Sequence, residues 1–466
     1  MRLKGADRAA ARPRAGWTAV ALALPTLASL APPGAGLTRP AQGALGVFGM
    51  AVVLWMSGAV PLPVTGLLIL AALPLFGVLP AAQAFALFGN PAVFFILGAF
   101  ILAAALMATG LSRRLSLVLL ARFGATPRRL STGVLATCAL LSCAVPEHAV
   151  AALMFPTVSA VVEALRLPPL RSRFAVNLYL SMAWGCVTGG IATLLGGARV
   201  PLALGILDEL AGRRIDFVSW SVAVGPLAAL LACAAWLAIQ FFFPPEIDNV
   251  DAAREILAKE RERAGPPSPR ERRAGAVALA TVAAWVFVGD SVGMAPVALL
   301  SAFALFAWDV LTWREVEAWV NWGVILMYGG AIALGGALTR TGAAAWLARG
   351  VLDGVSGPPW LFLAAAAAAT LGITELVSNA AAVAVVLPVA LSVAAASGVD
   401  PVLTMYAVAA ASGLTFTLPV GSPPNAIALS SGYYTTRRVA LPGVLLSAAS
   451  LLALAAAAWG YWPRVQ

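Results

Sequence analysis

Apolar runs about as long as a bilayer is thick recur along nearly the whole chain. A transmembrane helix needs about 20 consecutive, mostly apolar residues. Runs of roughly this length predict about 11 transmembrane helices, at residues 17–36, 44–60, 62–80, 92–112, 175–207, 218–243, 275–290, 293–312, 321–339, 401–433 and 439–462. The pattern therefore predicts a polytopic membrane protein built only of α-helices.

Two further apolar stretches, at about residues 130–166 and 358–397, are interrupted by polar residues near their middle. Each half holds about 15 residues, which is too short to cross a bilayer comfortably. A helical hairpin that enters and leaves on the same side fits this length better. The tip of such a hairpin lies at membrane depth, where irregular backbone is tolerated only against protein or a cavity. We therefore expect two re-entrant hairpins.

Composition supports the bilayer as the solvent. Of the 466 residues, 61% are hydrophobic and 11% are charged, whereas soluble domains carry roughly 25% charged residues. The net charge of +10 would suggest nucleic-acid binding in a soluble protein. Here the basic residues lie between the apolar runs, which is typical of cytoplasmic loops. We therefore expect a multi-pass protein of the inner (plasma) membrane with no nucleic-acid partner.

Loop charge predicts the orientation, because cytoplasmic loops carry an excess of Lys and Arg. If the basic N-terminus is inside, the other inside loops hold Arg113, Arg114, Arg122, Arg128, Arg129, Arg166, Arg171, Arg173, Arg437, Arg438 and the basic residues of the central linker. Arg213, Arg214, Arg340 and Arg349 would lie outside, against the trend. The balance predicts a cytoplasmic N-terminus, a first hairpin that opens from the inside and a second that opens from the outside.

The same pattern divides the chain into four parts. These are a basic cytoplasmic tail at 1–16, a first repeat at 17–243 with the hairpin 130–166 and an interrupted span at 175–207, a cytoplasmic linker at 244–274, and a second repeat at 275–466 with the hairpin 358–397 and an interrupted span at 401–433. The linker contains a charged run with helical character from Asp251 to Arg263. We expect it to be a solvated connector.

The two halves match each other at a constant offset. Gly98-Ala99-Phe100 aligns with Gly330-Ala331-Ile332, and the same shift of 232 positions maps Glu147 onto Asn379 and Pro156 onto Pro388. Since the two hairpins are expected to open on opposite sides, the repeats would be inverted. Inverted repeats with interrupted helices at corresponding places are typical of transporters whose site lies at the midplane.

Each hairpin is followed by a span that contains a break. The second-half break is Thr417-Leu418-Pro419-Val420-Gly421-Ser422-Pro423-Pro424-Asn425, and the first-half break runs from Thr193 to Pro201. Proline and glycine stop a helix inside an apolar span. The freed carbonyl groups can bind a cation, and the exposed helix N-termini can bind an anion. We therefore expect each half to supply one hairpin tip and one broken helix to a shared site.

These segments resemble the divalent anion/sodium symporter family over roughly residues 44–460. Thr374-Glu375-Leu376-Val377-Ser378-Asn379-Ala380 is similar to the family's second Ser-Asn-Thr hairpin tip, the paired-proline break matches at Leu418–Ile427, and Pro61-Leu62-Pro63-Val64-Thr65 resembles its early segment. The resemblance implies a homodimer that moves dicarboxylates, sulfate or similar small anions by sodium-coupled, elevator-type transport.

The resemblance also implies ligands. A sodium ion would be held by Thr374, Val377, Ser378, Asn379 and Gly421, and the anion would face Asn379, Ala380, Ser422 and Pro423. Oxygen ligands of this kind suit a hard cation. Ser142 and Gly197 match positions of a second sodium site.

The first half departs from the family pattern. Its Ser-Asn-Thr motif falls at Pro146-Glu147-His148, and the first proline of its break is Arg199. A carboxylate at membrane depth is costly unless it is paired, and its default interpretation is functional. We therefore add Glu147, His148 and Arg199 to the expected substrate site.

Two hypotheses for these residues stay open. In the first, Glu147 and Arg199 pair across the site and leave hydrogen-bond donors for the anion. In the second, Arg199 binds the anion bidentately and Glu147 binds a cation or a proton. Proton coupling is thus an alternative to Na⁺ coupling, because a buried carboxyl group or a histidine can titrate near neutral pH.

Other functions remain as alternatives to sodium-coupled transport. One is a proton-coupled or uncoupled anion permease, related to the arsenite and citrate permeases. Another is a membrane-embedded enzyme acting on lipids, with Glu147 and His148 as acid and base. We predict a transporter rather than an enzyme and assign no catalytic residue. The sequence alone does not name the anion.

Overall fold

The computed structural model describes residues 11–34, 36–123, 126–352 and 358–465, and these residues form helices and loops with no β-strand. The first half contains α2 (Ala11–Leu30), α3 (Arg39–Ser57), α4 (Leu62–Leu75), α5 (Ala81–Phe88), α6 (Pro91–Ala108), α7 (Leu111–Ala121), α8 (Pro127–Ser142), α9 (Glu147–Ala164), α10 (Arg173–Gly189), α11 (Arg199–Ala211) and α12 (Phe217–Phe242). The all-helical prediction is confirmed for the described residues. Arg2, Lys4 and Arg8 of the predicted basic tail lie outside them.

The second half follows a charged linker helix. It comprises α13 (Asp251–Ala264), α14 (Pro269–Phe287), α15 (Gly289–Val292), α16 (Met294–Ala307), α17 (Trp313–Trp319), α18 (Trp322–Arg340), α19 (Ala343–Leu352), α20 (Pro359–Thr374), α21 (Asn379–Ser397), α22 (Pro401–Ala411), the 3-10 turn η1 (Pro419–Gly421), α23 (Pro423–Ser430), α24 (Thr436–Ala456), the π-helical turn η2 (Ala457–Tyr461) and α25 (Trp462–Val465). The helix α13 coincides with the charged run that was expected to be helical.

Several helices begin where the sequence places a capping residue before a proline. The Thr126 hydroxyl accepts a hydrogen bond from the third residue of α8, and Ser268 forms a reciprocal capping box with Glu271 at the start of α14. Such caps satisfy amide groups that have no partner within the helix. Proline at the first helical position has its φ angle fixed near the helical value, and the N–H group that it lacks would have no partner within the helix. These local signals explain why α8 and α14 begin at Pro127 and Pro269.

The helix bounds repeat along the chain with the predicted spacing. Shifting α4 (Leu62–Leu75) by 232 positions gives the bounds of α16, and shifting α8 gives those of α20. The first residues of α9 and α21, Glu147 and Asn379, are also 232 positions apart. The two chain halves therefore contain the same order of helices across this region.

Helix packing repeats in the same way. The helix α4 crosses α18 where Gly66 meets Gly330, and α16 crosses α6 where Ala298 meets Gly98. A Cβ atom on Gly330 would lie 2.4 Å from the Gly66 backbone, and one on Gly98 would lie 2.6 Å from the Ala298 side chain. Small residues let helices approach closely in apolar surroundings. The two crossings occupy equivalent positions in the two halves and join one half to the other.

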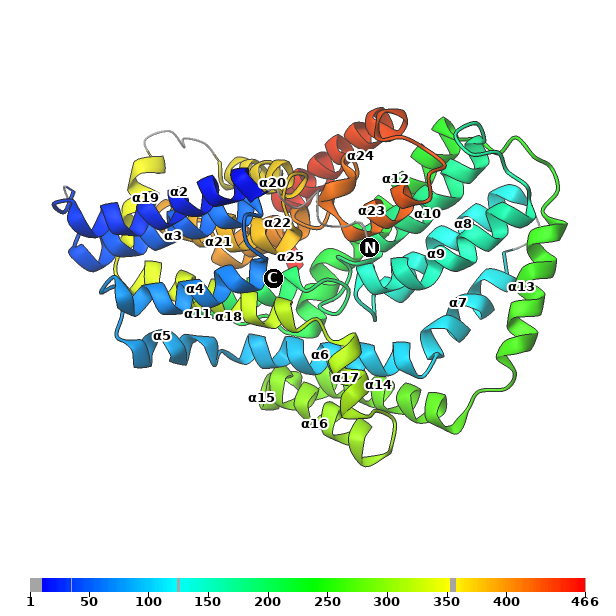
Figure 1. Cartoon of the computed structure of the whole chain (residues 1–466), viewed down its shortest axis with the longest axis horizontal. Helices are drawn as coiled ribbons and strands as arrows, with labels where there is room; N and C mark the ends of the chain where they lie inside the picture. Colours follow the sequence, from blue (N-terminus) through cyan, green and yellow to red (C-terminus); the bar gives the residue numbers. More distant parts are fainter. Residues whose placement is uncertain (1–10, 35, 124–125, 353–357, 466) are drawn as a thin grey trace.

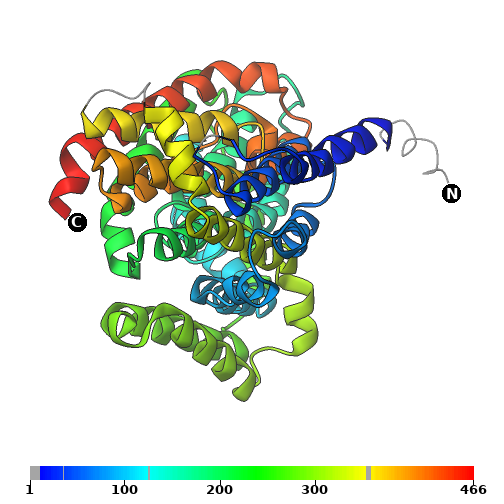
Figure 2. The same cartoon turned by 90° about the vertical axis from the view of Figure 1, so that its left-hand side faces the viewer.

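The helices are arranged in layers. In Figure 1, the row formed by α5, α6 and α7 runs along the long axis of the molecule, between α14–α16 below and the hairpin and broken helices above. Figure 2 shows α14–α16 as an outer layer, on the side opposite the C-terminal helices α20–α24. The hairpins and broken helices pack against one another on the inner side of this arrangement.

Within the described residues, six helical segments are long and apolar enough to cross a membrane. They are Arg39–Ser57, Ala81–Ala108, Phe217–Phe242, Trp322–Arg340, Asn379–Ser397 and Thr436–Val465. Shorter apolar helices are Leu62–Leu75, Met294–Ala307, Pro359–Thr374 and Pro401–Ala411. The structure thus supports several membrane helices, while the predicted number of spans and the re-entrant course of the hairpins stay predictions.

Ion pairs and hydrogen bonds join several of the loops that were expected to lie inside. Arg113 pairs with Glu260, and Arg114 donates to Glu271 and to linker carbonyl groups. In a separate contact, Arg438 donates to the Leu170 carbonyl. The hydrogen bond from Arg114 helps hold the pKa of Glu271 below its ordinary value, against the opposing effect of partial burial. The helix α7 and the linker therefore lie side by side.

Candidate functional site

The two hairpins end in short tips of equivalent length. The first tip joins Ser142, at the end of α8, to Glu147, the first residue of α9. The second joins Thr374, at the end of α20, to Asn379, the first residue of α21. The Ser378 hydroxyl caps α21 by accepting from the Ala381 amide, whereas Pro146 in the first tip offers no such group.

The two predicted breaks are present in the structure. In the first half, α10 ends at Gly189 and α11 begins at Arg199. In the second half, α22 ends at Ala411 and α23 begins at Pro423. The intervening backbone is irregular, apart from the short turn η1. Each half therefore supplies one hairpin tip and one broken helix, as the sequence pattern predicted.

A buried ion pair lies where these four elements meet. Arg199 donates from Nη1 to Glu147 Oε1 at 3.0 Å and from Nη2 to Glu147 Oε2 at 3.1 Å. Glu147 is 4% exposed and Arg199 is 3% exposed. The Glu147 amide also donates to the Gly196 carbonyl at 2.9 Å, which ties the first tip to the first break. This geometry matches the first hypothesis, in which the two charges pair with each other.

The second hairpin joins the same cluster. Asn379 Nδ2 donates to Glu147 Oε1 at 3.2 Å, so the two repeat-equivalent residues contact each other directly. The Thr374 hydroxyl lies 3.0 Å from Asn379 Oδ1 and 2.9 Å from the Ser412 carbonyl oxygen. A chain of polar groups thus runs from the first break to the second through both tips. Groups of this kind carry function by default at membrane depth.

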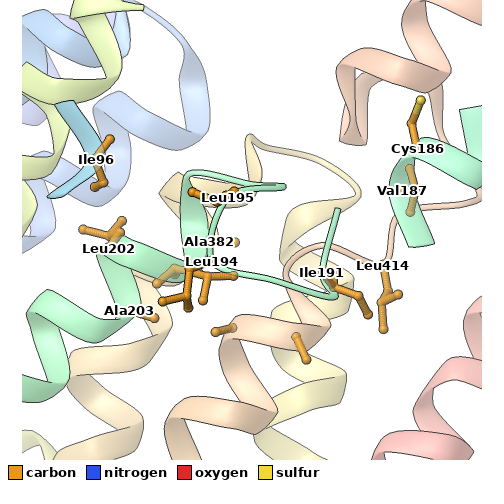
Figure 3. Packing of buried hydrophobic residues seen from close by; sticks show 14 of the residues in the cluster. Ile96, Cys186, Val187, Ile191, Leu194, Leu195, Leu202, Ala203, Ala382 and Leu414 are labelled. Atoms are coloured by element: carbon orange, nitrogen blue, oxygen red, sulfur yellow. The ribbon is translucent and has the colours of Figure 1, made fainter. Parts of the chain in front are cut away.

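Two glycines make room for the Arg199 guanidinium. A Cβ atom on Gly197 would lie 2.4 Å from Nη1, and a Cβ atom on Gly413 would lie 2.4 Å from both Nε and Nη2. The Arg199 Nε group is buried and has no hydrogen-bond partner. Figure 3 shows buried apolar residues packed at the two breaks, with Ile191 of the first break beside Leu414 of the second. The guanidinium is therefore clamped between the two breaks.

A second carboxylate, Glu375, organises the backbone after α22. Its oxygens accept from the amides of Phe416, Thr417 and Leu418 at 3.2, 3.0 and 2.8 Å. Hydrogen bonds to a charged acceptor are roughly twice as strong as those between neutral groups. Glu375 therefore fixes the second tip to the second break.

The second half contains oxygen atoms that fit a sodium ion. A Cβ atom on Gly421 would lie 3.1 Å from the Thr374 carbonyl oxygen and 3.1 Å from the Cβ and methyl carbons of Thr415, so these three residues lie close together. The hydroxyl oxygens of Thr415 and of Ser422, next to Gly421, are buried and have no hydrogen-bond partner. Uncharged oxygens of this kind suit a hard cation. Thr374, Thr415, Gly421 and Ser422 would hold the ion, which would supply positive charge beside the anion.

The two first-half positions expected for a second sodium do not fit one. The Ser142 hydroxyl is buried without a partner, but Gly197 lies against the Arg199 guanidinium. A bound cation there would face a permanent positive charge.

The other predicted residues lie at or near the cluster without joining its hydrogen bonds. The His148 side chain is partly buried, and among the described residues no hydrogen bond joins it to the polar network. Ala380 is partly buried beside Asn379, Val377 is buried in the second tip, and Pro423 is exposed at the start of α23. Asn425 donates to the Thr415 carbonyl at 2.8 Å and thereby links the start of α23 to the irregular backbone before it.

Sequence reasoning missed Thr415, Ser412 and Gly413. They lie just before the paired-proline motif, in a stretch that carries no motif of its own. Their roles depend on which side chains approach them across the break. A repeat comparison extended through the break would have drawn attention to Thr415, because the first-half counterpart is not polar.

Paired hairpin tips, paired broken helices and a buried polar junction are typical of secondary membrane transporters. The sequence pattern of the family described as "Sodium:sulfate symporter transmembrane region" matches residues 15–466. The chain therefore belongs to this family, which confirms the resemblance to the divalent anion/sodium symporters.

Relatives of known name agree with this membership. The chain is 27% identical over 443 residues to the sodium-dependent dicarboxylate transporter SdcS of Staphylococcus saprophyticus, covering 88% of this chain and 85% of the relative. It is 27% identical over 431 residues to SdcS of Staphylococcus aureus, covering 85% and 82%. The family and these relatives are transporters, not enzymes.

Two solved structures share the fold. Neisseria gonorrhoeae MtrF, described as one of a class of antimetabolite efflux pumps, superimposes with a TM-score of 0.58 at 15% identity and covers 81% of this chain and 82% of its own. The Alcanivorax borkumensis YdaH transporter gives a TM-score of 0.57 at 14% identity, with 81% and 86% covered. At these identities the likeness concerns the fold alone.

Proposed function

We propose that the protein is a sodium-coupled secondary transporter of a small anion, such as a dicarboxylate or sulfate. One observation carries the proposal: the hydrogen bond between Glu147 and Asn379 joins both hairpin tips at a buried polar junction. A polar centre of this kind is expensive within a membrane unless it serves a ligand path. The family membership and the sodium-dependent relatives support the same function.

The chemistry of the junction suits an anion. Asn379 can offer amide hydrogens, and the helices α21 and α23 begin at the junction with their positive N-terminal ends. A sodium ion held by Thr374, Thr415, Gly421 and Ser422 would add positive charge on the same side. Glu147 bears the opposite sign, and its pairing with Arg199 reduces its repulsion of an incoming anion.

We infer an elevator-type alternating-access cycle in a homodimer. The close crossings of α4 with α18 and of α16 with α6 would form the stationary scaffold, while the hairpins and broken helices would move. The predicted topology places this unit in the inner membrane with a cytoplasmic N-terminus. In this frame the hairpins are re-entrant and the repeats are inverted, because they open toward opposite sides.

A thermal-shift screen of the purified protein tests the function. Dicarboxylates, sulfate and citrate are added with and without sodium, at constant ionic strength. A ligand that binds only the folded state raises stability by mass action, so we expect an anion to raise the apparent Tm more in sodium than in choline. Asn379→Ala should abolish this anion-dependent shift. A sodium-independent shift with a matching pH dependence would instead favour the proton-coupled permease.

The lipid-enzyme alternative lacks a supporting arrangement. An acid–base pair needs both groups to face one reacting centre. Glu147 is held by Arg199 and Asn379, and His148 has no hydrogen-bond partner among the described residues. Lipid turnover by the purified protein, without anion uptake, would revive this alternative.

A further inference from the structure

We propose that the Arg199 side chain takes the place of a second sodium ion, so that each subunit binds a single sodium ion, in its second half. The inference rests on the proposed function only for the identity of that remaining ion. It concerns the side chains at equivalent positions, which differ between the two halves although the backbone pattern is the same.

Each second-half ligand position has a first-half counterpart. At the tips, a shift of 232 positions maps Ser142 onto Thr374 and Glu147 onto Asn379. In the breaks the shift is 224 positions, which maps Gly197 onto Gly421 and the first residues of α11 and α23, Arg199 and Pro423, onto each other. The two halves can therefore be compared one ligand at a time.

The first half has lost most of the hydroxyl groups that suit a cation. The counterparts of Ser378, Thr415 and Ser422 are Pro146, Ile191 and Ala198. Ile191 is fully buried, so its hydrocarbon side chain occupies interior space where Thr415 would present an oxygen. A hard cation needs several oxygen ligands to replace its water shell, and Ser142 supplies the sole hydroxyl kept at the compared positions.

The guanidinium fills the remaining space. Gly197 and Gly413 approach it from two sides, at distances that leave no room for a side chain on either residue. Glu147 closes a third side with two hydrogen bonds. Since Arg is charged at every accessible pH, this positive charge is permanent. It cannot be released on either side of the membrane.

A tethered cation changes the coupling. A sodium ion that binds and leaves with the substrate adds the energy of its gradient to transport. The Arg199 side chain stays on the protein throughout the cycle, so it contributes no such energy. The protein would therefore draw on one sodium ion per cycle and would require less sodium for binding. Glu147 balances the tethered charge, so the Glu147–Arg199 pair adds no net charge to the moving unit.

Sodium binding to the full-length protein in lipid nanodiscs tests the proposal without a transported substrate. The binding of ²²Na⁺ and the apparent Tm are measured against sodium concentration, with choline keeping the ionic strength constant. We expect one ion per subunit and a simple hyperbolic dependence. Binding of two ions per subunit, or a steep cooperative curve, would overturn the proposal.

Three variants locate the ion. Thr415→Val should abolish the sodium response, and Ser142→Ala should leave it unchanged. The control variant is Gly225→Ala, because an added Cβ atom there meets nothing within 4 Å. Loss of the response in Ser142→Ala but not in Thr415→Val would contradict the proposal.

A fourfold variant separates this inference from the proposed function. Glu147→Asn/Arg199→Ala/Ile191→Thr/Ala198→Ser removes both charges and restores two of the hydroxyl groups that the first half lacks, so we expect one more sodium ion per subunit than in the parent protein. If the parent protein shows no sodium response, sodium coupling fails. A response gained by the fourfold variant would then still support the replacement by Arg199, and no gain over the parent protein would refute it.

Discussion

The two hairpin tips have the same length and opposite chemistry. At the second tip, Glu375 binds three backbone amides and Asn379 faces the junction, so the charge serves the backbone and a neutral group faces the ligand region. At the first tip the counterpart of Glu375 is Cys143, and a charged Glu147 faces the junction. The difference shows that a repeated backbone can keep its shape while its two binding positions diverge.

This divergence changes what each half needs for stability. The second tip depends on amide groups that are always present in the backbone. The first depends on a single partner, Arg199, for the neutralisation of Glu147. Breaking a buried ion pair by removing one partner costs far more than removing both. The first half should therefore be the more sensitive to single substitutions at its tip.

The largest effect is expected for Arg199→Ala. It leaves Glu147 buried without its counter-charge, so the loss of stability should be about 3–5 kcal/mol. Glu147→Asn/Arg199→Ala should recover part of this loss. The apparent Tm in nanodiscs measures both. Arg340→Ala, which breaks a more exposed pair with Glu209, is the matched control and should cost no more than about 1 kcal/mol. Equal losses for Arg199→Ala and Arg340→Ala would refute the pairing argument.

Gly413→Ala should have the next largest effect. Its Cβ atom would lie 2.4 Å from the guanidinium of Arg199, which cannot retreat because Glu147 holds it. Overpacking of this kind costs typically about 1–3 kcal/mol. The apparent Tm should fall well below that of Gly225→Ala. A Gly413→Ala protein as stable as the parent would show that the clamp around Arg199 is loose.

Glu375→Gln compares the supports of the two tips. A neutral amide replaces a carboxylate that accepts from three amides, and hydrogen bonds to charged groups contribute about 1.5–3 kcal/mol. The substitution should lower the apparent Tm, whereas Cys143→Ala at the equivalent first-half position should change it little. Hydrogen exchange of the Phe416–Leu418 amides should also accelerate in Glu375→Gln. Unchanged exchange there would contradict the supporting role of Glu375.

The smallest effect lies outside the hairpins. A hydrogen bond from Arg270 lowers the pKa of Glu315 to about 2. Because the folded pKa lies below the unfolded value, this stabilisation is present above pH 4.5 and is lost as the pH falls toward 2. Arg270→Ala should lower the apparent Tm at neutral pH by no more than the equivalent of about 1 kcal/mol, and the difference should shrink in acid. If the Tm difference between Arg270→Ala and the parent protein grew as the pH fell, Arg270 would not lower the pKa of Glu315.

Much of this architecture follows from local patterns in the sequence. Interrupted apolar runs predicted both hairpins, and glycine and proline predicted a break in the span after each hairpin. The helices end somewhat before the predicted breaks, because α10 ends at Gly189 and α22 at Ala411. The offset between Glu147 and Asn379 predicted their equivalence, and the charge of Glu147 at membrane depth indicated a functional position. The family resemblance added the residues that we expect to hold sodium in the second half.

Contacts across the two halves could not be predicted in this way. The sequence left open whether Arg199 binds Glu147 or an anion, because that choice depends on where Gly197 and Gly413 leave space. Thr415 was missed for the same reason, since its unpaired hydroxyl becomes visible only once its surroundings are known. The short helices α5, α7 and α17 were also missed, because their apolar faces are too short to produce a spanning pattern.

Uptake by the reconstituted protein tests the central claim most directly. Vesicles containing the protein receive a radiolabelled anion selected by the thermal-shift screen, with an inward sodium gradient or with choline in its place. The account predicts accumulation that requires the sodium gradient and is lost in Asn379→Ala, at the contact between the two tips. Equal accumulation without a sodium gradient, or full activity in Asn379→Ala, would contradict it.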